Sequence, residues 1–261
     1  MTTVDRDLLE EAVGWARAAG ELTLAWFRSA ELGVDRKGDG SPVTAADKAA
    51  ERFLREAIAA AYPDDSIRGE EEDDVVGTSG RCWVIDPIDG TKAFTHGVGL
   101  YSNLLYLEDE HGPAIGIINL PALGETVYAG RGLGCFLNGQ PCHVSDRDKL
   151  TGSYLSTTWF AEWTQDQFAS VTGAGLQLRT WGDAYGYALV ASGRIEAMYD
   201  PALAWWDIAA LLVVVPEAGG TITSATGGPA DVPVDGGHEY AYSAVASNGR
   251  FHDQLVELLN P

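Results

Sequence analysis

Residues 83–91 read Trp-Val-Ile-Asp-Pro-Ile-Asp-Gly-Thr, a short apolar run that stops abruptly at two acids. The run has the composition of a buried strand, and functional side chains commonly follow such strands. The proline fixes the backbone between the two carboxylates. Gly90 allows close approach of an anion and frees amides near Thr91 to face phosphate oxygens. Two carboxylates held in this way suit hard cations such as Mg²⁺.

Asp-Pro and Asp-Gly are also common in surface turns, so this stretch alone leaves a turn and a metal site open. Two further motifs favour the metal site. Gly69-Glu70-Glu71 follows a short predicted strand at Ser66-Ile67, and Trp206-Asp207 opens a later predicted helix. Asp207 by itself fits a helix acid that is stabilised by the dipole. The sequence therefore predicts a site built from four acids, which are Glu70, Asp86, Asp89 and Asp207.

Two helices in succession are predicted upstream of the strand. Apolar residues recur at helical spacing from Val4 to Phe27 and from Ala49 to Ala61. The polar stretch 35–42 separates the two helices. Thr44 with Asp47 three residues later is typical of a helix start.

Downstream, the pattern changes to strands and then to an alternation of strands and helices. Residues 102–107 and 115–120 flank a predicted hairpin turn, and Asn138-Gly139 indicates another, so a meandering sheet is expected. The later predicted strands are 154–156, 195–199 and 243–246, and the predicted helices are 165–171, 183–191, 206–218 and 250–259. Such alternation favours an α/β or α+β sandwich.

Composition excludes several classes of protein. The 261 residues include 17 Lys and Arg against 38 Asp and Glu, a net charge of −21 that argues against nucleic acid or an anionic membrane as partner. A phosphate substrate would need local cations to reverse this field. Three cysteines without a CxxC pair fit a reducing compartment. The first residues lack the features of a signal peptide, so a cytoplasmic location is expected.

The order and spacing of three motifs resemble those of the inositol monophosphatase family. These motifs are Gly69-Glu70-Glu71, Asp86-Pro-Ile-Asp89-Gly-Thr91, and Trp206-Asp207-Ile-Ala-Ala followed by Glu217-Ala-Gly-Gly220. The resemblance covers essentially the whole chain. It implies an α+β fold layered αβαβα, a single phosphatase unit over residues 1–261 that divides into halves of about 1–150 and 151–261, and a homodimer.

The resemblance also implies a ligand set for about two or three Mg²⁺ ions in each active site. Glu70, Asp86 and the Ile88 carbonyl would bind one ion. Asp86, Asp89 and Asp207 would bind a second, and a third, weaker ion would share Glu70.

Catalytic roles follow from the same resemblance. Thr91, hydrogen-bonded to Asp47, would act with Glu70 to orient and deprotonate the attacking water. This agrees with the chemistry of phosphoryl transfer, which needs positioning and charge neutralisation more than a nucleophilic side chain. A relative that had kept the fold without the activity would lack one of these groups, and all three are present.

Three segments resemble the histidinol-phosphatase branch of the family. They are residues 179–194, Arg-Thr-Trp-Gly-Asp-Ala-Tyr-Gly-Tyr-Ala-Leu-Val-Ala-Ser-Gly-Arg, residues 198–201, Met-Tyr-Asp-Pro, and residues 247–249, Ser-Asn-Gly. The resemblance places Asp183, Asp200, Asp89 and Asp207 beside the substrate. L-histidinol phosphate would be hydrolysed to L-histidinol and phosphate in histidine biosynthesis, and an inositol 1-phosphate or sugar phosphate is the alternative substrate.

A physical argument supports the histidinol-phosphate interpretation. An ammonium group on the leaving side of the substrate needs an anion, which Asp183 or Asp200 would supply, whereas a polyol needs neutral partners. Trp205 or Tyr185 would offer a ring face to the imidazole or ammonium. The alternatives are a helix N-cap for Asp183, a turn acid for Asp200 and a core position for Trp205. The Trp205-Trp206 pair before Asp207 departs from the usual branch pattern.

Overall fold

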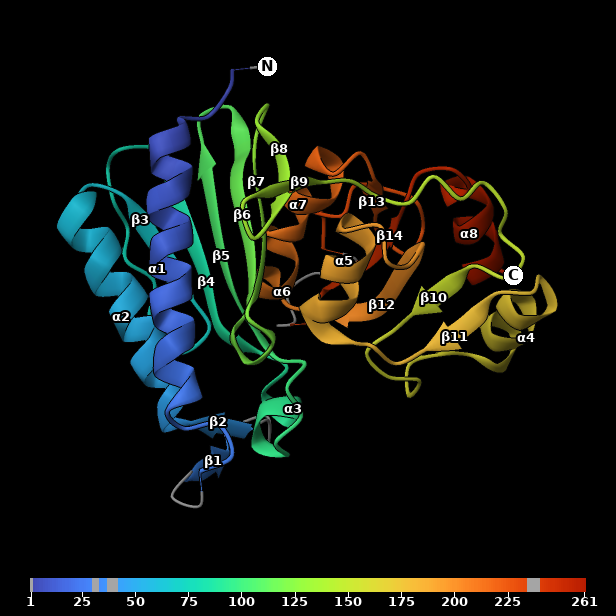
Figure 1. The fold of residues 1–261 in the computed structure, drawn as a ribbon, viewed down its shortest axis with the longest axis horizontal. Helices are drawn as coiled ribbons and strands as arrows, with labels where there is room; N and C mark the ends of the chain where they lie inside the picture. The colour runs from blue at the N-terminus through green and yellow to red at the C-terminus, as the bar shows by residue number, and fades with distance from the viewer. Residues whose placement is uncertain (1, 30–32, 37–41, 234–239) are drawn as a thin grey trace.

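The computed structural model describes residues 2–29, 33–36, 42–233 and 240–261 (Figure 1). Two sheets form its frame. The larger sheet has seven strands in the order β3-β4-β5-β6-β7-β8-β9, and only β3 and β4 are parallel neighbours. Its strands are β3 Ser66–Gly69, β4 Cys82–Asp89, β5 Ser102–Asp109, β6 Gly112–Leu120, β7 Glu125–Gly130, β8 Gly134–Leu137 and β9 Gln140–Cys142. The predicted meander and both predicted hairpins are confirmed, whereas β7 was not predicted.

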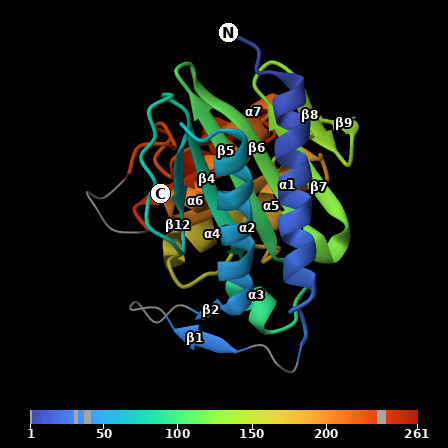
Figure 2. The ribbon, with the colours of Figure 1, turned by 90° about the vertical axis from the view of Figure 1, so that its left-hand side faces the viewer.

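Helices α1 (Arg6–Leu24) and α2 (Ala45–Ala61) lie side by side on one face of this sheet (Figure 2). Their apolar faces and that side of the sheet share one core, which includes Leu9, Leu54 and Trp83. Thr44 and Asp47 form the capping box at the start of α2, as the sequence predicts. Strands β1 (Val34–Arg36) and β2 (Pro42–Thr44) pair with each other at the margins of the predicted polar break. The centre of that break, residues 37–41, lies outside the described residues.

The second sheet has five strands in the order β11-β10-β12-β14-β13. They are β10 Tyr154–Ser156, β11 Gln177–Arg179, β12 Ala197–Leu203, β13 Thr221–Thr223 and β14 Tyr242–Ser247. The helices α4 (Gln165–Gly173) and α8 (His252–Leu259) share a core with one face of this sheet. The short strands β11 and β13 were not predicted.

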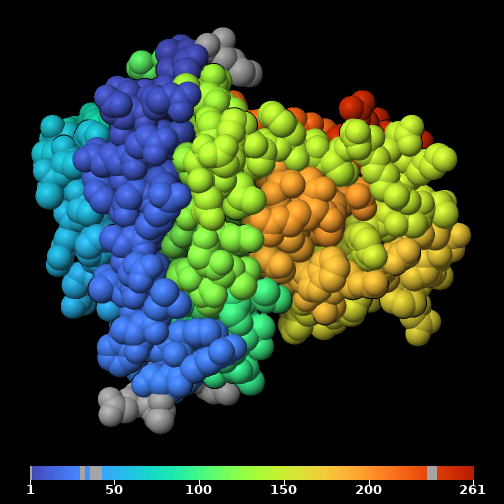
Figure 3. Space-filling model, in the orientation of Figure 1, coloured from blue at the N-terminus to red at the C-terminus, as the bar shows by residue number. Residues whose placement is uncertain are grey.

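Three helices fill the space between the two sheets: α5 (Asp183–Ala191), α6 (Trp205–Ala209) and α7 (Leu211–Glu217). The layers therefore run α, β, α, β, α, which confirms the predicted α+β sandwich. In the space-filling view, early and late parts of the chain occupy opposite ends of the molecule (Figure 3). A short helix, α3 (Thr91–Thr95), follows β4.

One prediction about the central helices is wrong. Residues 206–218 were expected to form one long helix, but the structure interrupts it at Ala210. A Cβ on Gly116 of β6 would lie 2.2 Å from the Ala210 carbonyl oxygen, so the junction packs directly on the sheet. Helical periodicity cannot reveal such a long-range contact. The predicted end at Gly219 is confirmed, since Gly219 has φ +84° and Gly220 donates to the Val215 carbonyl.

Two further features bear on the expectations from composition. In the part of the chain that the structure describes, no helix combines the length and apolarity needed to cross a membrane. The three cysteines are free thiols, and the Cys135 and Cys142 Sγ atoms lie 3.6 Å apart on paired strands.

Candidate metal centre and phosphatase site

Strand β4 carries the first two acids of the site. It continues beyond the predicted Trp83–Ile85 and runs through Asp86 and Asp89. Its pairing with β5 shifts register between these acids, with Asp86 opposite Leu104 and Asp89 opposite Ser102. The irregularity falls at the proline, which cannot donate to a sheet ladder. Both acids are buried in consequence of their place in a central strand.

Helix α6 supplies the third acid. Asp207 lies in its first turn and accepts a hydrogen bond from the Ala204 backbone N–H at 2.8 Å. Asp207 therefore does act as the helix acid that the sequence allowed. It also converges with the strand acids, because carboxylate oxygens of Asp86, Asp89 and Asp207 all lie within 4.8 Å of one another.

The three carboxylates resist ionisation together. Burial raises the pKa of Asp86, and the charges of Glu70, Asp89 and Asp207 raise it further. Burial raises the pKa of Asp207 to about 7, with Asp89 adding to the rise. Burial also raises the pKa of Asp89, although hydrogen bonds from Ser102 and Ala184 oppose the rise. A divalent cation among them would remove the repulsion and favour the ionised forms.

The residues present fit such a cation. Asp86 Oδ1 is buried, and no group among the described residues hydrogen-bonds to it. A buried carboxylate oxygen without a donor is costly unless a metal takes the donor's place. Oxygen ligands from three acids suit Mg²⁺ better than a soft metal. Glu70 lies near enough for its charge to raise the pKa of Asp86.

A buried ion pair on α2 holds the segment that carries Glu70. Glu51 Oε2 accepts from the Glu71 N–H at 2.8 Å, and Oε1 accepts from the Glu72 N–H at 3.0 Å. Arg55 pairs with Glu51 at 2.8 Å and donates to the carbonyl of Glu72 at 2.7 Å. Neither Glu51 nor Arg55 was predicted as a site residue. Their i, i+4 spacing was visible, but nothing in it indicated this contact.

Thr91 was expected to form a hydrogen bond with Asp47, but its hydroxyl has another partner. Its hydroxyl donates to the Ile88 carbonyl oxygen at 3.0 Å, and this bond uses the proton that we expected Asp47 to accept. Asp47 instead accepts from the backbone N–H and the hydroxyl of Thr44. The reason is local, because both Asp47 bonds belong to the α2 capping box and Thr91 bonds back across its own turn. The Ile88 carbonyl oxygen, a predicted metal ligand, therefore accepts a hydrogen bond from Thr91.

Gly90 and Asp183 meet at the start of α3. Gly90 has φ +79°, and a Cβ there would lie 2.8 Å from Asp183 Oδ2. Asp183 has φ +53°, and its N–H donates to Thr158 Oγ1 at 2.9 Å. Burial and the charges of Asp89 and other acids raise the pKa of Asp183. The N-cap alternative for Asp183 is wrong, because Gly182 is the N-cap of α5. The next residue, Ala184, donates its N–H to Asp89 Oδ2 at 2.7 Å.

Asp200 lies deeper and bonds to the protein on both carboxylate oxygens. Oδ1 accepts from the Thr158 N–H at 2.8 Å, and Oδ2 accepts from the Tyr187 hydroxyl at 3.1 Å. The side chain is only 1% exposed, and burial raises its pKa to about 6. This environment favours a role in shaping the site over direct contact with substrate. Thr158 was not predicted as a site residue, because no local sequence signal marks it.

Trp205 is partly buried and packs against the core between the layers. Its ring makes an edge contact with Tyr106 and a tilted contact with Tyr242, with centroids 6.1 and 5.4 Å apart. These contacts favour the core alternative for Trp205.

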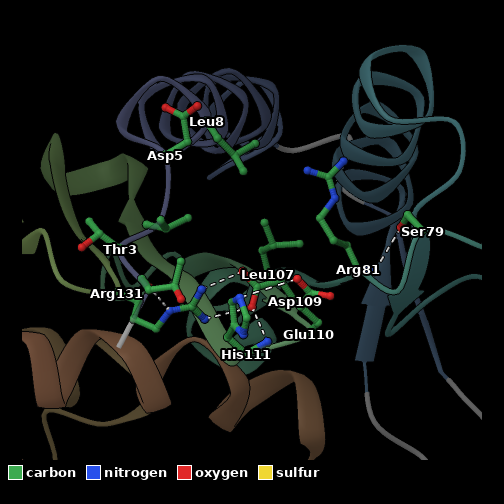
Figure 4. A pocket seen from close by; sticks show the side chains of 12 residues that line it. Thr3, Asp5, Leu8, Ser79, Arg81, Leu107, Asp109, Glu110, His111 and Arg131 are labelled. Atoms are coloured by element: carbon green, nitrogen blue, oxygen red, sulfur yellow. Dashed lines mark hydrogen bonds and ion pairs between the residues drawn. The ribbon is translucent and has the colours of Figure 1, made fainter.

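A cavity of about 370 Å³ has none of Asp86, Asp89 and Asp207 in its lining (Figure 4). It opens between the N-terminal segment and the turn that joins β5 to β6, and Arg131 forms part of its wall. Arg131 pairs with Asp109 at 2.7 Å and donates to the carbonyls of Thr2, Gly112 and Pro113. These bonds tie the N-terminus to the sheet, so we assign the chemistry to the acidic cluster and not to this cavity.

Known proteins resemble this chain in sequence and in fold. The sequence pattern of the inositol monophosphatase family matches residues 5–260. The histidinol-phosphatase of Chlorobaculum parvum is 45% identical over 81% of this chain and 83% of its own, and that of Mycobacterium tuberculosis is 36% identical over 98% and 99%. The solved structure of an IMPase from Thermotoga maritima matches with a TM-score of 0.84 and 30% identity, covering 97% of each chain.

Proposed function

This chain belongs to the inositol monophosphatase family, and from that premise we propose that it hydrolyses L-histidinol phosphate to L-histidinol and phosphate. It is a phosphoric monoester hydrolase, as its relatives are. The observation that carries the proposal is the convergence of Asp86, Asp89 and Asp207, with an oxygen of Asp86 left for a cation, beside the enclosed carboxylate of Asp183.

The family depends on metal, and Mg²⁺ is the ion that we propose. Glu70, Asp86 and the Ile88 carbonyl would hold one ion. Asp86, Asp89 and Asp207 would hold another, and Glu70 would share a third. The hard oxygen donors support this assignment. When bound, the ions would neutralise the phosphate dianion and make water a stronger acid.

The protein's own groups would position the reactants. Backbone amides at Gly90 and Thr91 would face the phosphate oxygens, and the left-handed glycine allows the anion to approach the turn closely. Glu70 would accept the proton of the attacking water. The Thr91 hydroxyl, directed to the Ile88 carbonyl, would orient that water by accepting its second hydrogen. Asp47 supports the arrangement as a positioning residue, through the cap of α2.

Asp183 would recognise the leaving group. Its carboxylate lies over Gly90, next to the turn that would hold the phosphate, and its pKa is raised because burial and neighbouring acids disfavour the charge. A substrate ammonium would relieve that penalty with a charge-assisted hydrogen bond. Asp200 already has two protein donors, so it would act by fixing Thr158 and Tyr187. Asp89 and Asp207 would approach the substrate from the metal side.

An inositol 1-phosphate or a sugar phosphate is the alternative substrate, since the acidic cluster would serve any phosphate monoester. The two readings separate in a panel of substrates. Phosphate release from L-histidinol phosphate, inositol 1-phosphate and fructose 1,6-bisphosphate in Mg²⁺ should give the highest kcat/KM for histidinol phosphate. A higher value for either of the others would assign the chain to that substrate.

Three further proposals concern the whole protein. We expect one phosphatase unit over residues 1–261, with a metal-binding half of about 1–150 and a substrate-binding half of about 151–261. We expect a homodimer, on the family resemblance alone. We expect a cytoplasmic location without nucleic-acid or membrane partners, which the free thiols and the net charge of −21 support.

A further inference from the structure

An exposed lysine and an exposed tryptophan meet beside the acidic cluster. Lys92 is the second residue of α3, directly after Thr91. Its Nζ lies 4.7 Å from the ring centroid of Trp159, within the range of a cation–π contact. Trp159 is 47% exposed, and Lys92 is exposed as well. Because both side chains are exposed, the contact between Lys92 and Trp159 does not belong to the hydrophobic core.

The segment that carries Trp159 is anchored to the site. Thr158, its neighbour, donates its N–H to Asp200 and accepts the Asp183 N–H on its hydroxyl. The Thr157 hydroxyl donates to the Trp159 carbonyl at 3.3 Å. The position of the indole is thus fixed through Thr158, which bonds to the Asp200 carboxylate and to the backbone N–H of Asp183.

The charge of Lys92 reaches the site. Burial and the neighbouring acids raise the pKa of Asp183, and Lys92 opposes that rise. Two other cations in the later half of the chain are engaged elsewhere. Arg179 of β11 stacks on Tyr154 and Trp181, and Arg194, between α5 and β12, pairs with Glu125 at 2.8 Å. A chain of net charge −21 repels a phosphate dianion, so a fixed cation at this point changes the local field.

We propose that Lys92, held against Trp159, is a substrate-binding residue that attracts the phosphate group of the incoming substrate and contacts it next to Thr91. The inference rests on the proposed phosphatase function and adds a phosphate-binding residue to it. The ammonium contributes to binding, whereas the acids carry the chemistry. Trp159 acts through Lys92 as a positioning residue.

Four variants test the pair. Lys92→Gln keeps most of the side chain without the charge, and Lys92→Arg keeps a charge that still stacks on indole. Trp159→Ala removes the ring, and Trp159→Phe keeps one. Lys92→Gln and Trp159→Ala should each raise KM about two- to fivefold, as expected for one exposed ionic contact, with kcat within about twofold of wild type. Lys92→Arg and Trp159→Phe should stay near wild type, as should Lys149→Gln, an exposed control.

Two readouts separate this role from a structural one. The double variant Lys92→Gln/Trp159→Ala should be no worse than Lys92→Gln, because the ring acts through the ammonium. Raising the ionic strength from about 0.02 to 0.3 M should raise KM more in wild type than in Lys92→Gln, since salt screens an exposed charge. Additive losses, or a larger loss for Trp159→Ala than for Lys92→Gln, would mean that the indole binds substrate itself and would overturn the proposal.

Calorimetric titration with inorganic phosphate in Mg²⁺ tests the contact of Lys92 with phosphate without requiring hydrolysis. Lys92→Gln should bind phosphate about two- to fivefold more weakly than wild type. A wild-type protein that hydrolyses nothing in the panel but shows this difference would contradict the function and keep the phosphate contact. If the wild type is an active phosphatase and Lys92→Gln binds phosphate as tightly as the wild type, the contact of Lys92 with phosphate is contradicted and the proposed function is not.

Discussion

Asp89 shows how one side chain serves both the fold and the site. Its Oδ2 accepts two hydrogen bonds of 2.7 Å, from the Ser102 hydroxyl of β5 and from the Ala184 N–H at the start of α5. The residue thus joins the larger sheet to a helix of the middle layer. A cation can bind the other oxygen without breaking either bond. The acid itself was predictable from its place after an apolar run, but Ser102 and Ala184 were not, because they lie 13 and 95 residues away.

Asp89→Asn should separate these two tasks. The amide oxygen can still accept from Ser102 and Ala184, while the metal loses a charged ligand. We expect kcat to fall about a hundredfold or more, since a bound metal supplies several kcal/mol of charge stabilisation. The metal-free variant should be at least as stable as wild type, because carboxylate repulsion is relieved. Near-normal turnover at ordinary Mg²⁺ would show that the ligand set is misassigned.

Asp183 and Asp200 should differ when each is changed to Asn. Asp183→Asn should lower kcat/KM for histidinol phosphate about tenfold to a hundredfold, the value of a charge-assisted hydrogen bond of about 1.5–3 kcal/mol. Glycerol phosphate, which lacks the ammonium, should lose little. Asp200→Asn should lower both rates alike, because its bonds go to Thr158 and Tyr187. Equal losses on both substrates for Asp183→Asn would leave the substrate assignment without its physical argument.

At the scale of elements, local signals were reliable and long-range contacts were not. The capping box at Thr44, the turn at Asn138-Gly139 and the cap at Gly219 are all short-range patterns, and each was predictable. The interruption at Ala210 depends on packing against Gly116 of β6, some ninety positions earlier in the chain. The contact of α2 with the Glu70 segment is of the same kind. The spacing of residues within α2 shows which face is apolar. It does not show that Glu51, a buried acid of this helix, accepts hydrogen bonds from the segment beside Glu70.

Glu51→Gln tests whether α2 positions Glu70. The change leaves Arg55 buried beside a neutral partner and removes an acceptor of the Glu71 or Glu72 N–H. We expect a loss of stability of about 3 kcal/mol, the lower end for breaking a buried pair, and weaker Mg²⁺ binding by calorimetry. The matched control is Glu51→Gln/Arg55→Met. It should regain stability because no buried charge remains, but it should not regain Mg²⁺ affinity. Recovery of both would mean that the pair serves the fold alone.

At the scale of the whole molecule, the sandwich gathers acids from separate layers into one place. Asp86 and Asp89 come from the larger sheet, and Asp183 and Asp207 come from the middle helices. The alternation of strands and helices predicted a sandwich, and the family resemblance predicted the order of its layers. Composition gives the sign of the net charge, but not which cation lies beside the acids. Lys92 and Trp159 meet through the fold, although they lie far apart in sequence.

Thermal stability without metal should fall as the pH rises. The pKa values of Asp200 and Asp207 are raised to about 6 and about 7, so the folded state binds protons that the unfolded state has lost. Their stabilisation is complete below the unfolded pKa and is lost as pH rises through the folded pKa. Asp207 titrates between pH 6.5 and 8, so in EDTA the Tm should drop by several degrees over this range, at about 2–4 °C per kcal/mol.

Asp207→Asn should flatten that dependence, and Mg²⁺ should raise the wild-type Tm most at pH 8, where the acids are ionised. A metal-free Tm that rises between pH 6.5 and 8 would contradict the assignment of buried, repelling carboxylates.

The most direct measurement is the initial rate of phosphate release from L-histidinol phosphate by metal-stripped protein, with and without added Mg²⁺. We predict no measurable rate in excess EDTA, full recovery on adding Mg²⁺, and little recovery in Asp89→Asn. Undiminished hydrolysis by the metal-free protein, or the absence of hydrolysis in saturating Mg²⁺, would contradict a magnesium-dependent histidinol phosphatase.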